Sequence, residues 1–277
     1  MNVLSLFDGV SAGQIALLRA GVKVDNYFAS EIDKKAIDVT QHNFPNTIQL
    51  GDVRQLNKNM LPKIDLLIGG SPCQGFSTSG KMLGFIDERS ALFFEYVRLL
   101  NELKPNYFLL ENVKMRESDL QVITDVLGVN PITLNSALVS AQNRIRNYWM
   151  NFPVREVVDC NVELDSILES PGKSAIVSCR KTKNGNNQTL TVTGRKKSNT
   201  ITASGTYKIG VSNLPIGNYA NYFLRKNELD FRPFSTIEMA RLQTFPDDYF
   251  DAVSKNAARA LIGNSWTVDL ISRFFDG

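Results

Sequence analysis

The sequence contains few of the residues that build disulfide frameworks or metal sites. It has three cysteines, Cys73, Cys160 and Cys179, without a CxxC spacing, and a single histidine, His42. An odd and unpatterned set of cysteines argues against a disulfide framework and a cysteine-rich zinc site, and indicates a reducing compartment. A mechanism that needs two histidines is excluded.

Long hydrophobic runs are absent as well. No stretch reaches the ~18 uninterrupted apolar residues of a membrane helix, and residues 1–7 carry no basic leader of the kind that precedes a secretory signal. The 277 residues are 43% hydrophobic, which is enough for a folded core. This length fits one large domain, or one domain that carries a smaller one.

Acidic residues are missing from one long segment. The whole chain has 31 Lys and Arg against 28 Asp and Glu, but residues 171–226 contain ten basic and no acidic residues. The remaining chain therefore has an acidic balance of −7. A basic loop surrounded by water and a surface for a polyanion both explain this segment, and charge alone leaves the two open.

The first half of the chain alternates short apolar runs with segments of helical periodicity. Apolar runs that end in Gly, Asp or Glu predict buried strands, and apolar residues three and four apart predict helices. This alternation predicts an α/β fold: a Rossmann-like, mostly parallel sheet with helices on both faces. The expected strands are residues 3–7, 27–29, 48–50, 65–68 and 107–110, and the expected helices are residues 13–20, 34–43 and 91–103.

After about residue 151 the composition changes to Asn, Thr, Ser, Gly and Lys, and the helical periodicity disappears. Residues 188–193 and 199–202 alternate like strands. Helical character returns at 235–242 and from 256 onward. We therefore expect a catalytic domain at 1–154, a small, irregular, β-rich domain at 155–230, and C-terminal helices at 231–277 that return to the first domain.

Polar residues follow the expected strands, at the edge where ligands of such sheets bind. The glycine-bearing turn at 7–13 would bring backbone N–H groups to a ligand. Glu31, about 20 residues further, stands where an acid binds ribose hydroxyls, and Asp52 could accept a hydrogen bond from an adenine amino group. These features favour a nucleoside ligand, although three solvated loop acids remain the alternative.

Cys73 lies in the sequence Ser71-Pro72-Cys73-Gln74, directly after an expected strand and among polar neighbours. A thiolate at such a junction can be exposed and stabilised, which suits a nucleophile. Cys160 and Cys179 lack this setting and are expected to be inert. Glu111 follows a neighbouring expected strand, and Arg144 and Arg146 alternate so that both can point to one side of a strand.

In this order the segments resemble the cytosine-5 DNA methyltransferases over nearly the whole chain. The turn at 7–13, Pro72-Cys73-Gln74, Glu111-Asn112-Val113 and Gln142-Asn143-Arg144-Ile145-Arg146 match their signatures, as do residues 238–246 and Gly263-Asn264-Ser265. Ser11, where many bacterial members have glycine, and Trp266 resemble the eukaryotic de novo enzymes. Gln74, Gln142 and Asn264 resemble bacterial and phage enzymes.

The resemblance implies a DNA (cytosine-5)-methyltransferase that flips its target base. Cys73 would attack carbon 6, Glu111 would hold the cytosine edge and stabilise protonation at the ring nitrogen, and Arg144 would anchor the base carbonyl. Arg146 would support the site or bind phosphate. The methyl group would come from S-adenosyl-L-methionine, giving S-adenosyl-L-homocysteine, with no metal.

Further roles follow from the resemblance. The residues expected to bind the cofactor are Phe7, Asp8, Gly9, Gly13, Glu31, Ile32, Asp52, Val53, Pro72, Leu92, Asn264 and Ser265. Those expected to contact DNA are Gln74, Ser77, Arg195, Lys196 and Lys197.

The expected partner is double-stranded DNA, with no membrane involved. We expect a monomer in the cytoplasm of a prokaryotic cell or phage-infected host, with a cognate restriction endonuclease as a further candidate partner. A tRNA cytosine-5 methyltransferase, which would carry a less basic recognition region, and a binding module with an inactive site are the alternatives. The intact Cys73, Glu111 and Arg144 argue against the second.

Overall fold

The computed structural model describes residues 1–72, 92–182, 185–203, 209–214, 220–222 and 231–276. The chain divides into two compact units. The first comprises Met1–Asn135, Ile145–Val157 and Val268–Gly277, and the second comprises Ser136–Arg144 and Val158–Thr267. In the described part of the chain, no helix has the length and apolar character needed to cross a membrane.

A seven-stranded sheet forms the centre of the first unit, in the order β3-β2-β1-β4-β5-β7-β6. The neighbours from β3 to β5 pair in parallel, whereas β7 is antiparallel to both β5 and β6. The predicted α/β class with a mostly parallel sheet is thereby confirmed. The strands are β1 Asn2–Leu6, β2 Asn26–Ser30, β3 Ile48–Gln49, β4 Leu66–Gly69, β5 Tyr107–Val113, β6 Ile132–Asn135 and β7 Ile145–Met150.

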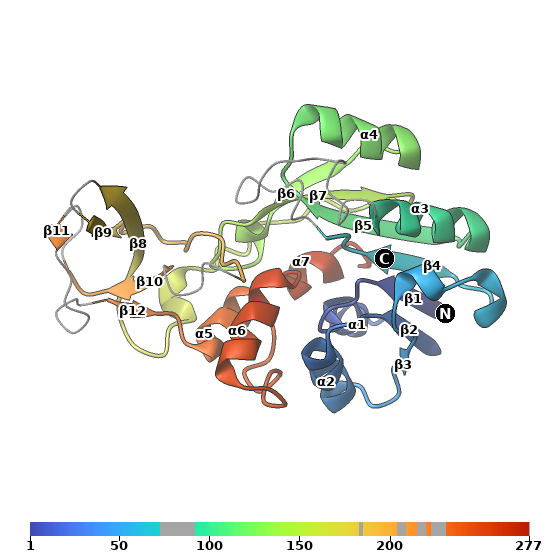
Figure 1. Cartoon of the computed structure of the whole chain (residues 1–277), viewed down its shortest axis with the longest axis horizontal. Helices are drawn as coiled ribbons and strands as arrows, with labels where there is room; N and C mark the ends of the chain where they lie inside the picture. The colour runs from blue at the N-terminus through green and yellow to red at the C-terminus, as the bar shows by residue number, and fades with distance from the viewer. Residues whose placement is uncertain (73–91, 183–184, 204–208, 215–219, 223–230, 277) are drawn as a thin grey trace. The chain divides into compact units, whose positions relative to one another are not determined.

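Helices cover both faces of this sheet, with α3 and α4 on one side and α1, α2 and α7 on the other (Figure 1). An ion pair of 2.5 Å between Arg19 Nη1 and Asp269 Oδ1 joins α1 to α7. The helices are α1 Ala12–Arg19, α2 Lys34–Asn43, α3 Leu92–Leu103, α4 Glu117–Leu127 and α7 Val268–Ser272, and the short 3₁₀ turns η1 Val53–Gln55 and η2 Lys58–Met60 follow β3.

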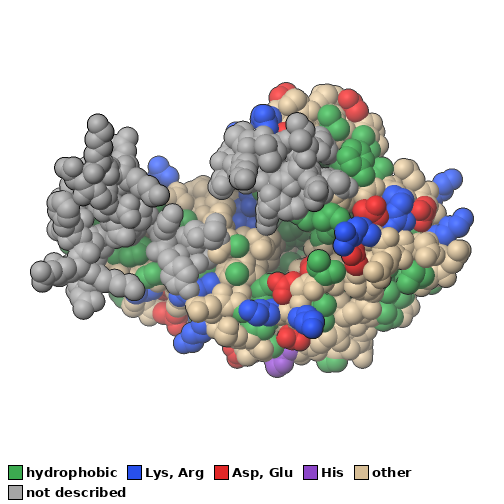
Figure 2. Space-filling model, in the orientation of Figure 1, with side chains coloured by type: hydrophobic (Ala, Val, Ile, Leu, Met, Phe, Trp, Pro, Cys, Tyr) green, Lys and Arg blue, Asp and Glu red, His purple; other side chains and the backbone are tan. Residues whose placement is uncertain are grey.

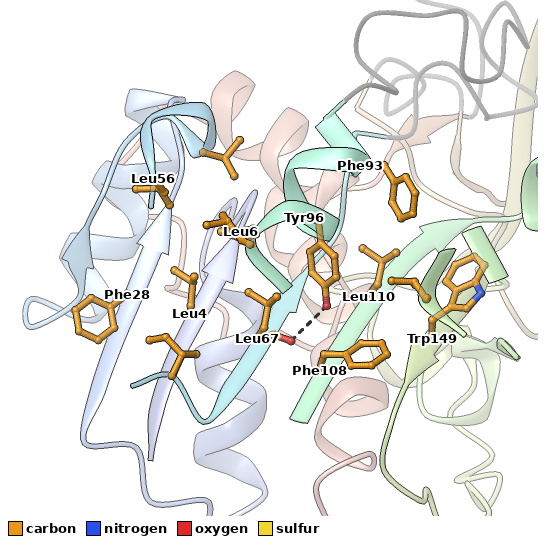
Figure 3. Close-up of a cluster of buried hydrophobic side chains, with 14 of the residues drawn as sticks. Leu4, Leu6, Phe28, Leu56, Leu67, Phe93, Tyr96, Phe108, Leu110 and Trp149 are labelled. Atoms are coloured by element: carbon orange, nitrogen blue, oxygen red, sulfur yellow. Dashed lines mark hydrogen bonds between the residues drawn. The ribbon is translucent and has the colours of Figure 1, made fainter. Parts of the chain in front are cut away.

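The main core lies between one face of the sheet and the helices α3 and α4, which cover that face (Figure 3). Because side chains alternate along a strand, Leu4 and Leu6 of β1 point to this face together. They meet Phe93 and Tyr96 of α3, and the Tyr96 hydroxyl donates to the Leu67 carbonyl at 3.4 Å. This packing fixes the sheet and therefore the edge at which the polar residues emerge.

The second unit contains a separate antiparallel sheet, in the order β11-β9-β8-β10-β12, with a small core of Ala175, Leu190 and Val192. In this unit, the Ser235 hydroxyl caps α5 by accepting from the Glu238 N–H, and the Glu238 carboxylate accepts from the Ser235 N–H. The elements are η4 Ser136–Leu138, η5 Leu164–Ser166, β8 Lys173–Thr182, β9 Gly185–Val192, β10 Ile209–Ser212, β11 Ala220–Tyr222, β12 Arg232–Pro233, α5 Thr236–Leu242 and α6 Lys255–Asn264.

The prediction of a strand at residues 199–202 is wrong. The chain here pairs with residues 141–143 through one isolated bridge, Gln142 with Ser198, and no ladder continues from it. The Ile201 N–H donates instead to the side-chain oxygen of Gln142 at 2.7 Å. The strand expected at 188–193 is present, as part of β9. The predicted domain boundaries at 154 and 230 stay predictions.

Candidate active site

The turn after β1 adopts an unusual backbone conformation. Phe7, Gly9 and Ser11 all have positive φ, at 56°, 60° and 57°. Glycine enters this region freely, but serine does so at a cost of roughly 1–2 kcal/mol, and a bulky residue such as phenylalanine is a clear outlier. Such strain gathers at functional sites because the surrounding structure holds it in place.

Glu31, the expected ribose acid, lies just after β2. Its carboxylate accepts hydrogen bonds from three backbone N–H groups, those of Gly9 at 2.8 Å, Ile32 at 2.7 Å and Asp33 at 2.9 Å. The bond from Gly9 ties the turn after β1 to the end of β2. The two strand ends that sequence analysis assigned to one nucleoside are therefore directly connected.

Asp52, the expected adenine-side acid, follows β3 and caps η1 by accepting from the Arg54 N–H at 3.0 Å. The Arg54 guanidinium also donates to both carboxylate oxygens. Its Nε lies 3.0 Å from Oδ1 and from Oδ2, and its Nη2 lies 2.5 Å from Oδ2. These hydrogen bonds hold the pKa of Asp52 below its ordinary value. The Ser30 hydroxyl donates to the Gly51 carbonyl at 2.7 Å, which fixes the end of β2 beside Asp52.

The apolar residues expected to contact the cofactor differ in exposure and fall into three groups. Ile32, next to Glu31, is 69% exposed although it is a large aliphatic side chain. Phe7 and Leu92 are half-buried against the main core. Val53 and Gly13 are buried, Gly13 in the first turn of α1. Ile32 is the member of this set that offers most free apolar surface to a ligand.

Asp8, an expected cofactor contact, is hydrogen-bonded within the protein, and its contact with the cofactor stays a prediction. Its carboxylate accepts from the Ser11 hydroxyl and, at 2.9 Å, from the Tyr27 hydroxyl. Burial raises the pKa of Asp8 to about 6 against the lowering effect of these hydrogen bonds, and the nearby charge of Glu31 adds to the rise. Each carboxylate oxygen thus accepts a hydrogen bond from a protein hydroxyl.

Glu111 was expected at a strand end, but it lies inside β5, opposite Tyr148 of β7. It is 9% exposed and forms an ion pair with Arg146, with 3.0 Å between Arg146 Nε and Glu111 Oε1. Arg146 lies on β7, opposite Val113. The pair places a carboxylate and a guanidinium side by side in a largely buried position, two residues before the carboxyl end of β5.

Asn112 connects Glu111 to the segment that leads into the nucleophile motif. Its buried side-chain amide donates to the Ser71 hydroxyl at 3.0 Å, two residues before Cys73. Pro72, an expected cofactor contact, is half-buried. The predicted nucleophile Cys73 and the predicted DNA contacts Gln74 and Ser77 lie outside the described residues.

Arg144 and Arg146 were expected on one side of a single strand, and this is wrong, since β7 begins at Ile145 and Arg144 precedes it. Arg144 is buried in the second unit, at 3% exposure. Its guanidinium donates to the carbonyls of Ile201 at 3.0 Å, Ser265 at 2.8 Å and Gly263 at 3.3 Å. These contacts make Arg144 a cross-link between three segments of the second unit.

Two buried glutamines complete this cross-link. Gln142 donates to the Leu242 carbonyl at 3.1 Å, and Gln243 donates to the carbonyls of Ile262 and Ser265, each at 3.2 Å. The signature segments around residues 142–144, 242–243 and 263–265 therefore lie together in the second unit.

The segment Gly263-Asn264-Ser265 ends α6. A Cβ at Gly263 would lie 2.4 Å from the Ala203 backbone nitrogen, so glycine is required there by close approach. Asn264 is exposed, and the Ser265 hydroxyl donates to the Ile262 carbonyl at 2.8 Å. Their expected contact with the amino-acid end of the cofactor stays a prediction.

The three cations expected to contact DNA lie in different surroundings. Arg195 is exposed and donates to the Asn199 side chain at 3.3 Å. Lys196 is also exposed and pairs with Glu163 at 2.5 Å. Lys197 is half-buried, and its ammonium donates to the carbonyls of Ala137 at 2.6 Å and Ser140 at 3.2 Å. Lys197 therefore supports the η4 turn of the second unit, which its charge alone did not indicate.

Basic and acidic side chains are interspersed on the face of the first unit that Figure 2 shows. This mixture agrees with the charge count, which assigns the excess of positive charge to residues 171–226. A surface of mixed sign attracts a polyanion less strongly than a segment without acids.

Several residues that hold the site together have no role that the sequence predicts. Asn112 and Gln142 belong to recognised signatures, so their position was a usable signal. Tyr27 and Thr40 carried none, because a hydroxyl in an ordinary strand or helix looks the same whether or not it reaches a neighbouring loop. Their contacts become visible when β2 and α2 pack beside the turn at 7–13.

Comparison with known proteins places these observations in a family. The model of the C-5 cytosine-specific DNA methylase family matches residues 1–127 and 120–276. The chain is 32% identical over 308 aligned positions to the type II methyltransferase M1.ScrFI of Lactococcus lactis subsp. cremoris, covering 98% of this chain and 76% of that protein. It is 47% identical over 116 residues to the orphan methyltransferase M.Rho11sI of Bacillus phage rho11s, covering 41% of this chain and 23% of that protein.

The chain thus aligns with about a quarter of the length of the phage relative. Among solved structures, a DNMT2 mutant from Spodoptera frugiperda has a TM-score of 0.71 at 22% identity, covering 98% of this chain and 97% of that one. At this identity the likeness shows a shared fold. The chain belongs to the C-5 cytosine-specific DNA methylase family.

Proposed function

We propose that this protein methylates carbon 5 of cytosine in double-stranded DNA, with S-adenosyl-L-methionine as methyl donor and Cys73 as covalent nucleophile. The observation that carries the proposal is the Glu111–Arg146 pair in β5 and β7, joined through the Asn112–Ser71 hydrogen bond to the Pro72-Cys73 segment. A carboxylate and a guanidinium beside the segment that leads into a cysteine are suited to the activation of a pyrimidine ring.

The residues of the first unit fit S-adenosyl-L-methionine. Glu31 and Asp52 end neighbouring strands with carboxylates suited to the hydroxyl and amino donors of an adenosine, and the exposed Ile32 offers an apolar contact for its base. The backbone of the turn at 7–13 is held in place by the Gly9–Glu31 bond. When bound, the cofactor supplies the electrophilic methyl group.

The chemistry assigned to the chain begins with Cys73. The thiolate forms a bond to carbon 6 of the flipped cytosine, and the electron pair displaced from the 5,6 double bond makes carbon 5 nucleophilic. Glu111 holds the amino and ring-nitrogen edge and stabilises a proton there. After methylation, loss of the proton from carbon 5 restores the double bond and expels the Cys73 thiolate.

We assign the guanidinium that anchors the base carbonyl to Arg146 rather than to Arg144. Arg146 lies against Glu111, so the two side chains can address adjacent polar atoms of one pyrimidine ring. A positive donor at the base carbonyl stabilises the charge that develops there. Arg144 has its guanidinium on three backbone carbonyls, which supports a role in holding the second unit together.

DNA binding is assigned to the basic segment of the second unit. Lys173 and Arg195 are exposed cations, and Lys196 shares an exposed ion pair that contributes little to stability and can be exchanged for a phosphate. Lys197 leaves this group, because its ammonium is engaged within the protein.

Covalent trapping tests the proposal. A duplex that contains 5-fluorocytosine should form a stable adduct with the wild-type chain in the presence of S-adenosyl-L-methionine, because fluorine at carbon 5 blocks the final elimination. Cys73→Ala should form no adduct and still bind the cofactor. Transfer to tRNA in place of duplex DNA would overturn the assigned substrate, and an adduct formed by Cys73→Ala would overturn the nucleophile.

A further inference from the structure

Ser11 is a non-glycine residue held in the left-handed region, at φ 57° and ψ 38°, directly before α1. It is fully buried, at 0% exposure. A serine in this conformation needs surrounding contacts that keep it there. Asp8 of the turn and Thr40 of α2 supply these contacts, and Tyr27 of β2 in turn bonds to Asp8.

The hydroxyl groups around Ser11 form a chain of hydrogen bonds that ends on Asp8. Thr40 of α2 donates to the Ser11 hydroxyl at 3.2 Å, and Ser11 donates to Asp8 Oδ2. Tyr27 of β2 donates to Asp8 Oδ1 at 2.9 Å, and the Ser11 N–H donates to the Asp8 carbonyl at 3.2 Å. Thr40 and Tyr27 are both buried, so the chain fixes Asp8 from two secondary-structure elements.

Asp8 also belongs to the peptide group that donates a hydrogen bond to Glu31. The Asp8–Gly9 peptide presents the Gly9 N–H to Glu31 Oε2 at 2.8 Å, and the Asp8 N–H donates to the Ser30 carbonyl at 3.1 Å. A rotation of the turn would break these bonds together. The orientation of Glu31 therefore depends on the conformation that Asp8 and Ser11 maintain.

We propose that Asp8 is a positioning residue for cofactor binding: its carboxylate holds Ser11 in the left-handed conformation and thereby sets the Gly9–Glu31 contact. The proposal rests on the proposed function, since the ligand used to read it is S-adenosyl-L-methionine. Asp8 acts through Ser11 and makes no contact with the cofactor. This replaces the expectation that Asp8 is itself a cofactor-binding residue.

The charge state of Asp8 offers a second way to test this role. Burial raises its pKa to about 6, and the groups that act on it are the hydroxyls of Ser5, Ser11 and Tyr27 and the carboxylate of Glu31. An ionised carboxylate accepts from Ser11 and Tyr27 together, whereas a protonated one must use one oxygen as a donor. The hydrogen bond from the Ser11 hydroxyl to Asp8 therefore holds Ser11 most firmly above pH 6, where the carboxylate is ionised.

A double-mutant cycle of Asp8→Ala and Ser11→Gly tests the proposal through cofactor dissociation constants measured by calorimetry. Asp8→Ala alone should weaken binding about tenfold. Ser11→Gly should bind like the wild type, because glycine adopts the left-handed conformation unaided. In the Ser11→Gly background, Asp8→Ala should cost less than threefold. An equal tenfold loss in both backgrounds would mean direct contact with the cofactor and would overturn the proposal.

The pH dependence supplies a control that a purely structural role would not produce. Wild-type affinity should fall as the pH drops from 8 to 5 through about 6, and Asp8→Asn should show a flat profile over the same range. Tyr27→Phe, which removes the other bond to Asp8, should weaken binding less in the Ser11→Gly background than in the wild type, because Asp8 acts through Ser11. A wild-type profile in Asp8→Asn would contradict the proposal.

The same cycle followed by thermal unfolding separates this proposal from the proposed function. If the wild-type chain binds no S-adenosyl-L-methionine, the proposed function fails, but the coupling of Asp8 to Ser11 can still be measured. Asp8→Ala should then lower the unfolding temperature more in the wild-type background than in the Ser11→Gly background. Equal shifts in the two backgrounds would overturn the positioning role on its own.

Discussion

Arg144→Ala should destabilise the protein strongly, because the lost guanidinium serves three buried carbonyls at 2.8 to 3.3 Å. A hydrogen bond from a charged group contributes about 1.5–3 kcal/mol, so the three together contribute roughly 5 kcal/mol. Typical domains are stable by about 5–15 kcal/mol. At roughly 2–4 °C per kcal/mol for a chain of about this size, the unfolding temperature should fall by about 10–20 °C.

Arg146→Ala should instead lower the rate of methyl transfer. Removing one donor that stabilises developing charge reduces kcat by about 10²–10³. Some stability is lost as well, since Glu111 loses its ion pair at 3.0 Å. Differential scanning calorimetry should be combined with single-turnover transfer to duplex DNA, measured at a temperature below the unfolding midpoint of every variant.

Arg144→Lys is the matched control, because an ammonium keeps the charge but cannot reach three carbonyls at once. Its folded fraction should transfer methyl groups at nearly the wild-type rate, with an intermediate unfolding temperature. If Arg144→Lys unfolds like the wild type yet is inactive, while Arg146→Ala is active, the roles assigned to the two arginines are refuted.

Three further predictions concern the cofactor edge and the basic segment. Asp52→Ala should weaken S-adenosyl-L-methionine binding by about ten- to a hundredfold, from a lost bond of roughly 1–3 kcal/mol, whereas Arg54→Ala should leave it within threefold; equal effects of the two variants in a titration would argue against the role of Asp52. The pKa of Asp8 rises on folding from 3.8 to about 6, so the folded state holds the extra proton between these values. Wild-type stability relative to Asp8→Asn should therefore fall by about 3 kcal/mol as the pH rises through this window, and a pH-independent difference in urea unfolding would contradict it. Replacing Arg195 and Lys196 with alanine should lower the logarithmic salt slope of DNA binding by about two without changing cofactor affinity, and an unaltered slope would show that neither cation meets phosphate.

The fold of the first unit was largely predictable from sequence because its central strands are buried on both faces. Runs such as residues 3–6 are mostly apolar and are followed by glycine or acidic residues, so the type of element is marked, although β5 continues three residues beyond its predicted end. The helix at Lys34–Asn43 was predicted with its observed limits. By contrast, β6 is short and partly exposed, so its sequence resembles a loop.

Partners of individual polar groups were the part that sequence could not supply. The alternation of Arg144 and Arg146 says that both can face one way, but not that a strand begins between them and assigns them to different units. The Thr-Ile-Thr run at 200–202 alternates like a strand, yet its backbone is satisfied by the side chain of Gln142. Lys197 looked like its neighbours until its ammonium was located on two carbonyls.

The most direct test of the central claim is nucleoside analysis by mass spectrometry of duplex DNA incubated with the protein and S-adenosyl-L-methionine carrying a labelled methyl group. We predict labelled 5-methyl-2′-deoxycytidine with the wild-type chain and none with Cys73→Ala. Label on an exocyclic amino group of cytosine or adenine, or 5-methyl-2′-deoxycytidine formed by Cys73→Ala, would contradict the account.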